Sequence, residues 1–180
     1  MKDAWLIPAV CLALLLAGCA QKAAGPQEEM KNASGFRVAS SAYADGGSIP
    51  EEYTCDGQET SPPVSFSGIP DGARSIALVY DDPDAPGGTY DHWVMWNIPL
   101  SGAIEKGSAP PGAVQGVNSG GSNKYAGPCP PSGTHRYIFH AYALDAVLDL
   151  PQTAGSAELY KAIQGHVLAS STYEGTYRRE

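Results

Sequence analysis

Glycine and proline divide most of this sequence into short apolar runs. They account for 21 and 15 of the 180 residues, a fifth of the chain, and are dispersed instead of massed in repeats. Because both residues end regular elements and favour turns, the pattern is typical of one all-β domain with many turns. Residues 74–80 are apolar after the first two, which predicts a central strand buried on both faces.

Strands are expected to dominate the fold. The other main strands are predicted at residues 36–42, 64–66, 92–98, 136–144 and 172–178, with a long irregular loop at 107–122. Trp93 and Trp96 would fall on opposite faces of their strand. Because strands do not alternate with helices along the chain, we predict antiparallel sheets packed as a sandwich.

One helix is predicted, near the C-terminus, at residues 156–169. Ser156 is a suitable N-cap, and Glu158 in the first turn would interact favourably with the helix dipole. The buried stripe would be formed by residues that recur at every fourth position, Leu159, Ile163 and Val167.

The N-terminal segment is predicted to be a targeting sequence. Residues 6–17 form an apolar run too short to span a bilayer comfortably, and it ends in Leu16-Ala17-Gly18-Cys19. This ending resembles the lipobox of bacterial lipoproteins, with Cys19 as the lipidated residue; an ordinary signal peptide with a chance cysteine is the alternative. We expect residues 1–18 to be a lipoprotein signal peptide, 19–34 a flexible tether and 35–180 the folded domain.

The predicted location is the bacterial cell envelope, with the lipid as the only membrane anchor. Ala20 stands where an aspartate would indicate inner-membrane retention, so in a Gram-negative host we expect the periplasmic face of the outer membrane. The formal net charge of −8 argues against nucleic acid as a partner and against general attraction to anionic membranes. An anionic ligand would therefore need local hydrogen-bond donors.

Two stretches of the sequence share one layout, in which a proline-stiffened loop leads to a histidine and then to a strand. The first loop carries Asp81, Asp82 and Asp84 and leads to His92. The second begins at residue 127 and leads to His135. We predict that the two loops meet and form one polar pocket.

These loops resemble the motifs of the phosphatidylethanolamine-binding protein family, specifically its bacterial Raf kinase inhibitor-like branch. The matching residues are Asp82-Pro83-Asp84-Ala85-Pro86, His92-Trp93, Gly127-Pro128-Cys129-Pro130-Pro131 and His135-Arg136-Tyr137. Weaker matches extend the resemblance over nearly all of the chain after about residue 36. The resemblance implies a Greek-key sandwich of two antiparallel sheets with a small anion-binding cavity at one edge; we expect no cofactor.

The resemblance also implies which residues line the cavity: Asp82, Ala85, Pro86, His92, Cys129, Pro130, His135 and Tyr137. Both histidines and the tyrosine hydroxyl can donate hydrogen bonds to a phosphate-like group. Asp82 would instead accept a hydrogen bond from a histidine and fix the tautomer of its ring. Asp84 is expected to hold its own loop, and Arg136 to form a structural ion pair.

Purely structural roles are the alternative for the same side chains. Asp82 could only cap its loop, and His92 and His135 could be satisfied core histidines. A structural role is the preferred interpretation for His140 and His166, which are predicted on a strand face and on the helix stripe.

Two cysteines remain in the mature chain once Cys19 is lipidated. An oxidising compartment favours pairing of Cys55 with Cys129, and the fold implied by the resemblance brings both loops to the same side. We therefore predict a disulfide between them.

The expected function is binding of a small anionic or phosphorylated ligand, such as phosphoethanolamine, without catalysis. The first alternative is inhibition of a protease or signalling protein through the surface, since some family members inhibit peptidases. Aspartates and histidines can bind zinc, but neither H-x-x-x-H nor C-x-x-C occurs, so no metal site is expected. A hydrolase is less favoured, because Ser132 near His135 is not part of a G-x-S-x-G motif.

Overall fold

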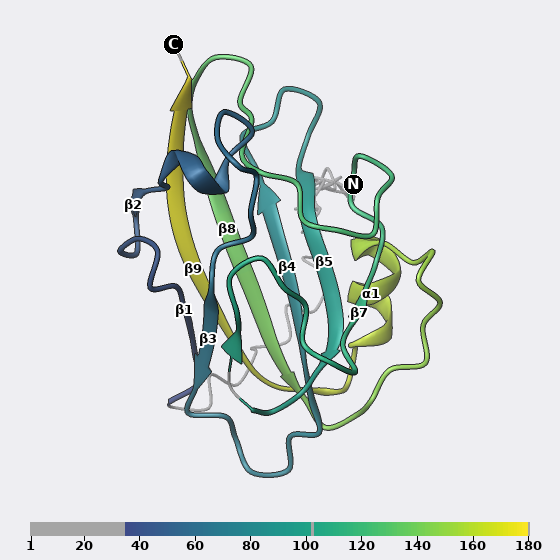
Figure 1. The fold of residues 1–180 in the computed structure, drawn as a ribbon. Helices are drawn as coiled ribbons and strands as arrows, with labels where there is room; N and C mark the ends of the chain where they lie inside the picture. The colour runs from purple at the N-terminus through teal and green to yellow at the C-terminus, as the bar shows by residue number, and fades with distance from the viewer. Residues whose placement is uncertain (1–34, 102, 180) are drawn as a thin grey trace, which may run out of the picture.

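Two β-sheets face each other in the computed structural model, which describes residues 35–101 and 103–179 (Figure 1). The larger sheet contains, in spatial order, β2 (Gly47–Ser48), β9 (Val167–Arg179), β8 (Gly133–Leu144), β4 (Ser75–Asp82), β5 (Tyr90–Ile98) and β7 (Val114–Gln115). The smaller sheet contains β1 (Arg37–Ala39), β3 (Val64–Ser67) and β6 (Ala103–Ile104). A short 3-10 helix, η1 (Glu51–Tyr53), and one α-helix, α1 (Ser156–Ala162), complete the described elements.

The strand pairing is antiparallel except between β2 and β9, which run parallel. Strand β8 returns past β5 and β7 to lie beside β4, which is the spatial order of a Greek key. The expectation of a mainly antiparallel sandwich with one minor helix is therefore confirmed.

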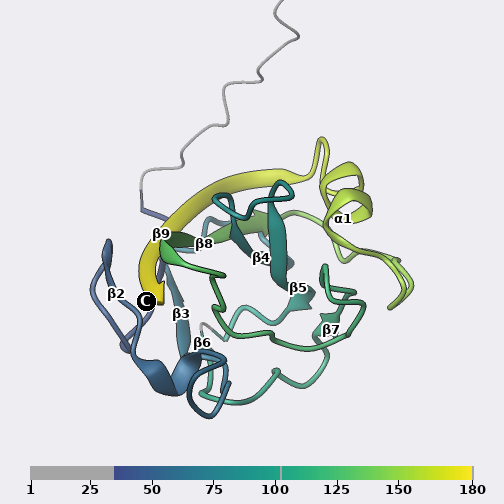
Figure 2. The ribbon, with the colours of Figure 1, turned by 90° about the horizontal axis from the view of Figure 1, so that it is seen from above.

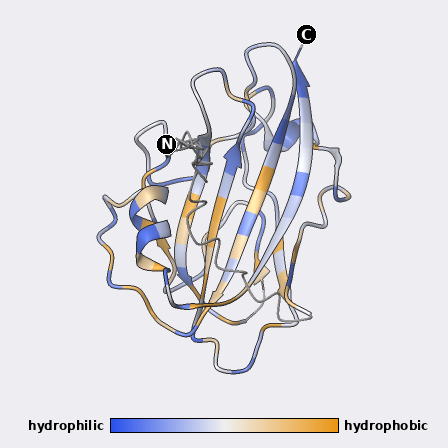
Figure 3. Cartoon of the chain, turned by 180° about the vertical axis from the view of Figure 1, so that it is seen from behind, coloured by the Kyte–Doolittle hydropathy of each residue, from blue (hydrophilic) through white to orange (hydrophobic). Residues whose placement is uncertain are grey.

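The core has two parts, one on each face of the larger sheet. Side chains between the two sheets form the larger part, where the rings of Tyr80 and Phe139 stack with centroids 4.1 Å apart. On the opposite face, Leu159 and Ile163 of the α1 segment pack on the sheet (Figure 2). Every residue of β4 is buried, as its apolar run predicts, and hydrophobic residues are concentrated along the central strands (Figure 3). Trp93 and Trp96 belong to opposite parts, which confirms the predicted facing.

The predicted helix at 156–169 is wrong in length, because α1 ends at Ala162. Ile163 is the C-cap of the helix, and Gly165, with a φ of +78°, lies in the turn that follows it. β9 then begins at Val167, which pairs with Leu144 of β8. Val167 is thus a strand residue and not part of a helical stripe, and β9 starts five residues before the predicted position of 172. Long-range pairing outweighed the local helical pattern.

The start of α1 also differs from the expectation. Gly155 is the N-cap in place of Ser156, and the Glu158 carboxylate accepts a hydrogen bond from the Gly155 N–H at 3.0 Å. This bond lowers the pKa of Glu158. The acidic side chain therefore does stabilise the first turn, but through a direct bond to the backbone.

Other strands also end at positions that differ from the predicted ones, and the common reason is the pairing with neighbouring strands. β4 extends through Asp81 and Asp82, which were expected in a loop, because both pair with the start of β5. The first strand is only Arg37–Ala39, which is its paired length against β3. The loop predicted at 107–122 contains the two-residue strand β7.

None of the helices within 35–101 and 103–179 is long and apolar enough to cross a membrane. The predicted signal peptide, the tether and the lipid attachment at Cys19 fall in residues 1–34, outside the described part of the chain.

Candidate functional site

The site is built where β4, β5 and β8 lie side by side at one end of the larger sheet, drawn uppermost in Figure 1. Asp82 is the last residue of β4, His92 lies near the start of β5, and His135 lies near the start of β8. Because β4 is the central strand of the three, its terminal carboxylate lies between the two histidine-bearing strands.

A β-bulge in β5 determines which face of the larger sheet the His92 side chain occupies. Tyr80 pairs with Trp93 and Asp81 pairs with Asp91, so His92 is an extra residue without a partner on β4. Adjacent strand residues normally point to opposite faces, but His92 contacts the rings of Tyr80 and Tyr137 in the core part to which Trp93 also belongs. The bulge therefore turns His92 towards the space between the sheets.

The Asp82 carboxylate holds His135 in a fixed orientation. Its Oδ2 accepts a hydrogen bond from His135 Nδ1 at 2.7 Å, and its Oδ1 accepts one from the Asp84 N–H at 2.8 Å. Both side chains are buried, at 5% exposure for Asp82 and 10% for His135. Because both oxygens are used, the buried charge is satisfied, and with the proton on Nδ1 the Nε2 of His135 makes no hydrogen bond to a described residue.

His92 is oriented by the backbone instead of by a carboxylate. Its Nδ1 donates to the Ala126 carbonyl oxygen at 2.9 Å, and its Nε2 makes no hydrogen bond to a described residue. Burial lowers the pKa of His92, so the ring is neutral at pH 7. In that state Nε2 carries a lone pair and accepts hydrogen bonds.

Asp84 and Arg136 hold the first loop against β8. The carboxylate of Asp84 accepts hydrogen bonds from Arg136 Nε at 2.9 Å, from Nη2 at 2.7 Å and from its backbone N–H at 3.0 Å. The guanidinium lowers the pKa of Asp84 to about 2. Asp84 thus helps to hold the loop, and Arg136 forms a structural ion pair, as the sequence analysis expected.

A disulfide forms part of the pocket wall. Cys55 and Cys129 are bonded across a sequence separation of 74, as predicted. The same two loops are joined by a hydrogen bond from the Cys55 N–H to the Pro128 carbonyl oxygen at 3.1 Å. At Gly127 an added Cβ would lie 2.9 Å from the backbone of residues 53 and 54, so the loops approach too closely for any other residue.

These loops and strand ends enclose a pocket of about 360 Å³. It is lined by Cys55, Glu59, Asp82, Ala85, Pro86, Tyr90, His92, Gly127, Cys129, Pro131 and His135. Six of the eight residues expected to line a cavity are therefore brought together.

Pro130 and Tyr137 are the two expected lining residues that do not line the pocket. Both are buried, and Pro131 lines the wall in place of Pro130. Tyr137 lies edge-on to His92 with ring centroids 5.3 Å apart, and burial raises the pKa of its phenol. Its hydroxyl is buried without a hydrogen-bond partner in the described part of the chain.

The sequence analysis missed Glu59, Tyr90, Gly127 and Pro131 as lining residues and named Cys55 only for its disulfide. Glu59 reaches the wall because its Oε1 accepts the Gly127 N–H at 3.1 Å, a contact between residues 68 positions apart. Tyr90 packs on His92 with ring centroids 4.8 Å apart. Gly127 and Pro131 stand in the motif around Cys129, and Tyr90 stands two residues before His92, so these three had a signal in the sequence, whereas Glu59 had none.

The other histidines lie apart from this pocket. His140 pairs with Asp81 at 3.3 Å, and His166 pairs with Asp145 at 2.8 Å and lies beyond the end of α1. Within 35–101 and 103–179, no three His, Cys, Asp or Glu side chains are arranged to hold a metal ion.

Removal of the disulfide should lower the stability of the domain. In the chain-entropy model a loop of this length is worth about 4.5 kcal/mol, so Cys55→Ala/Cys129→Ala should lower the free energy of unfolding by up to that amount. Urea unfolding of the variant measures the loss, and reduction of the unaltered protein is the matched control. Non-reducing peptide mapping that recovers both residues as free thiols would contradict the bond.

Comparison with known proteins identifies the family. Residues 39–178 match the phosphatidylethanolamine-binding protein family. A UPF0098 protein of Methanothermobacter thermautotrophicus is 50% identical over 144 residues, covering 77% of this chain and 95% of the relative. The UPF0098 protein PH1269 of Pyrococcus horikoshii is 39% identical, covering 97% of this chain and 90% of the relative.

Two solved structures share the fold. A phosphatidylethanolamine-binding protein homolog of Chlamydia trachomatis has a TM-score of 0.78 and 38% identity, covering 81% of this chain and 98% of that one. Escherichia coli YbcL, described as a member of the mammalian family of these proteins, has a TM-score of 0.75 and 30% identity, covering 81% and 99%. The chain belongs to the phosphatidylethanolamine-binding protein family.

Proposed function

We propose that the pocket between the two loops binds a small anionic or phosphorylated ligand and does not transform it. The observation that carries the proposal is the state of the two histidines. Each ring is fixed through Nδ1, by Asp82 in one case and by the Ala126 carbonyl in the other, and each Nε2 is left without a partner in the described part of the chain. A ring that carries its proton on Nδ1 presents a lone pair at Nε2, so two such nitrogens in one pocket favour an anionic ligand that can also donate an O–H.

The charge of the pocket restricts the form of the ligand. Glu59 and Asp82 both line the pocket, and the side chain of Asp82 is only 5% exposed. A fully ionised dianion therefore meets repulsion from two carboxylates. A singly protonated phosphate avoids part of this cost, because its O–H can donate a hydrogen bond to the lone pair at Nε2 of neutral His92. A phosphate monoester such as phosphoethanolamine also offers an ammonium group to the acidic wall. The name of the matching family and that of the Chlamydia trachomatis structure both contain phosphatidylethanolamine, whose headgroup is this compound.

Calorimetric titration with phosphate and with phosphoethanolamine tests the proposal. We expect saturable binding to the full-length protein, weakened at least about tenfold in His92→Ala/His135→Ala, because each ring contributes a hydrogen bond to a charged group. His166→Ala removes an exposed histidine outside the pocket and serves as the control. A folded protein that binds neither compound, or a double variant that binds both unchanged, would contradict the proposal.

The pH dependence of sulfate binding tests the role of His92. The folded-state pKa of His92 lies below its ordinary value of about 6.5, so the imidazolium forms only as the pH falls beneath that value. Sulfate stays a dianion over this range, and a cationic Nε2–H donor attracts it, so its affinity should rise as the pH is lowered from 7 towards 5. The rise should be smaller in His92→Gln. An equal slope in both proteins would assign the titration to another group.

The lowered pKa of His92 in the folded chain also makes the protein less stable in acid. Because the unfolded chain binds the His92 proton at a higher pH than the folded chain, this residue contributes stability above about pH 6.5. The contribution declines as the pH falls from there to the folded-state pKa. Bound sulfate should reduce the decline.

The proposal includes attachment to the cell envelope through a lipid on Cys19. It is supported by the sequence Leu16-Ala17-Gly18-Cys19 after an apolar run. After expression in a bacterial host with lipoprotein processing, mass spectrometry should find a mature chain that begins at lipidated Cys19 and sediments with membranes. Cys19→Ser should lose the lipid, whereas Cys11→Ser, the matched control, should keep it. An unlipidated mature chain would refute the anchor.

A further inference from the structure

The disulfide between Cys55 and Cys129 lies where a thiol from solution can reach it. Cys129 is exposed and Cys55 is half-buried, and both residues line the pocket between the two loops. Exposed disulfides are more readily opened than those that are buried in a core. The position of this bond therefore permits exchange with a small thiol.

The end of β9 places a cation against one of the two sulfur atoms. The Arg179 guanidinium donates from Nη1 to Cys129 Sγ at 3.6 Å, and its Nη2 pairs with Asp56 Oδ1 at 2.9 Å. Tyr177, two residues earlier on the same strand, donates its hydroxyl hydrogen to Asp56 Oδ2 at 2.9 Å. Because Asp56 directly follows Cys55, these contacts fix a cation at one cysteine and a carboxylate next to the other.

These charges make the two sulfur atoms unequal in exchange. A thiolate that forms at Cys129 is stabilised by Arg179, whereas a thiolate at Cys55 would have the Asp56 carboxylate as its neighbour. The sulfur that bears negative charge more easily is the better leaving group. We therefore expect an incoming thiol to bond to Cys55 and to displace Cys129.

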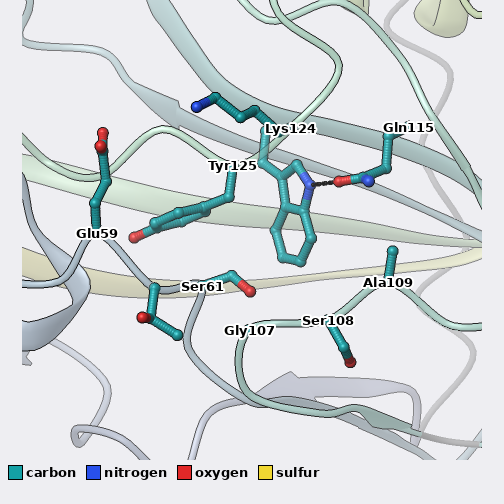
Figure 4. Close-up of a pocket in the computed structure, with 10 residues that line it drawn as sticks. Glu59, Ser61, Gly107, Ser108, Ala109, Gln115, Lys124 and Tyr125 are labelled. Carbon is teal, nitrogen blue, oxygen red and sulfur yellow. Dashed lines mark hydrogen bonds between the residues drawn. The ribbon is translucent and has the colours of Figure 1, made fainter.

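Three hydrogen bonds join the same two loops without using the sulfur atoms. They run from the Cys55 N–H to the Pro128 carbonyl oxygen at 3.1 Å, from the Gly127 N–H to Glu59 Oε1 at 3.1 Å and from the Tyr125 hydroxyl to the Tyr53 carbonyl oxygen at 2.7 Å. Figure 4 shows Glu59 and Tyr125, which belong to two of these bonds, at the wall of a neighbouring cavity. Opening of the disulfide is thus expected to leave the domain folded.

We propose that this disulfide is a site of thiol–disulfide exchange with a small dithiol, and that its opening weakens anion binding in the adjacent pocket. In the first step a thiolate of the dithiol bonds to Cys55 Sγ, the disulfide breaks, and Cys129 Sγ departs with the electron pair as a thiolate beside Arg179. The second sulfur of the dithiol, after loss of its proton, then attacks its partner sulfur in the mixed disulfide. The dithiol leaves as a cyclic disulfide, and Cys55 takes a proton from water.

The opened form carries an additional negative charge at the pocket wall. Cys129 lines the pocket together with His92 and His135, so its thiolate repels an anion held there. The effect on affinity rests on the proposed anion site, whereas the exchange reaction does not. Because linkage between two equilibria is reciprocal, bound phosphate should make the disulfide harder to open by the same factor.

The rate at which dithiothreitol opens the disulfide in the full-length protein tests the exchange reaction. Free thiols are trapped with iodoacetamide and quantified at Cys55 and Cys129 by peptide mapping, while near-UV circular dichroism reports the fold. Arg179→Gln should slow the opening about threefold, which is the scale of a surface charge pair. Arg178→Gln removes an exposed neighbouring charge and should leave the rate unchanged. Equal rates in all three proteins, or a bond that opens only in urea, would overturn the proposal.

Glutathione identifies the sulfur that is attacked, because a monothiol stops first at the mixed disulfide. Peptide mapping after a short reaction should find glutathione on Cys55 and the alkylated thiol on Cys129. Glutathione mainly on Cys129 would contradict the direction that Arg179 is inferred to impose.

Phosphate titration of the oxidised and the reduced protein at about pH 8, where thiols begin to ionise, tests the effect on the pocket. The reduced protein should bind phosphate about threefold or more weakly. Cys55→Ala/Cys129→Ala lacks the thiolate and should bind more tightly than the reduced protein. Equal affinity of the oxidised and reduced forms would overturn the regulation and leave the anion site standing. Absence of binding to the oxidised protein would overturn the anion site and the regulation together, without affecting the exchange assays.

Discussion

The burial of β4 on both faces is the constraint on which the rest of this structure depends. Its apolar residues join the two parts of the core, and strands β5 and β8 pair along its sides. The strand ends in two aspartates that stay within the buried ladder, and a buried carboxylate is costly unless it is paired. At Asp82 the cost is offset by His135 and by the backbone of residue 84, so the packing of the central strand and the orientation of a site histidine are one arrangement.

Two local departures from regular structure adapt this scaffold to hold a pocket. The bulge at His92 turns one side chain to the face that a regular strand would give only to Trp93. The disulfide between Cys55 and Cys129 joins the loop that carries Glu59 to the loop before β8. The pocket is therefore built on sheet ends and a covalent link, which favours a preformed site over one that assembles around its ligand.

The sequence predicted those parts that depend on local pattern. The apolar run at 74–80 identified the central strand, and the motifs around Asp82, His92 and His135 identified the residues that meet in the pocket. The end of α1 was not predictable from helical periodicity, because it depends on Val167 pairing with Leu144. Glu59 was missed because only its long-range contact with Gly127 brings it to the wall. Pro130 and Tyr137 differ because the motif indicates proximity to the pocket and not which side chains face it.

The central claim is that two histidines, each fixed through Nδ1, offer Nε2 to one anionic ligand. Nitrogen-15 NMR of histidine-labelled protein tests it most directly, because the ring nitrogens report protonation and hydrogen bonding separately. The account predicts protonated Nδ1 in both His92 and His135, and a change at both Nε2 nuclei on addition of phosphate or phosphoethanolamine. Unprotonated Nδ1 in either ring, or Nε2 signals that do not respond to either compound in a folded protein, would contradict it.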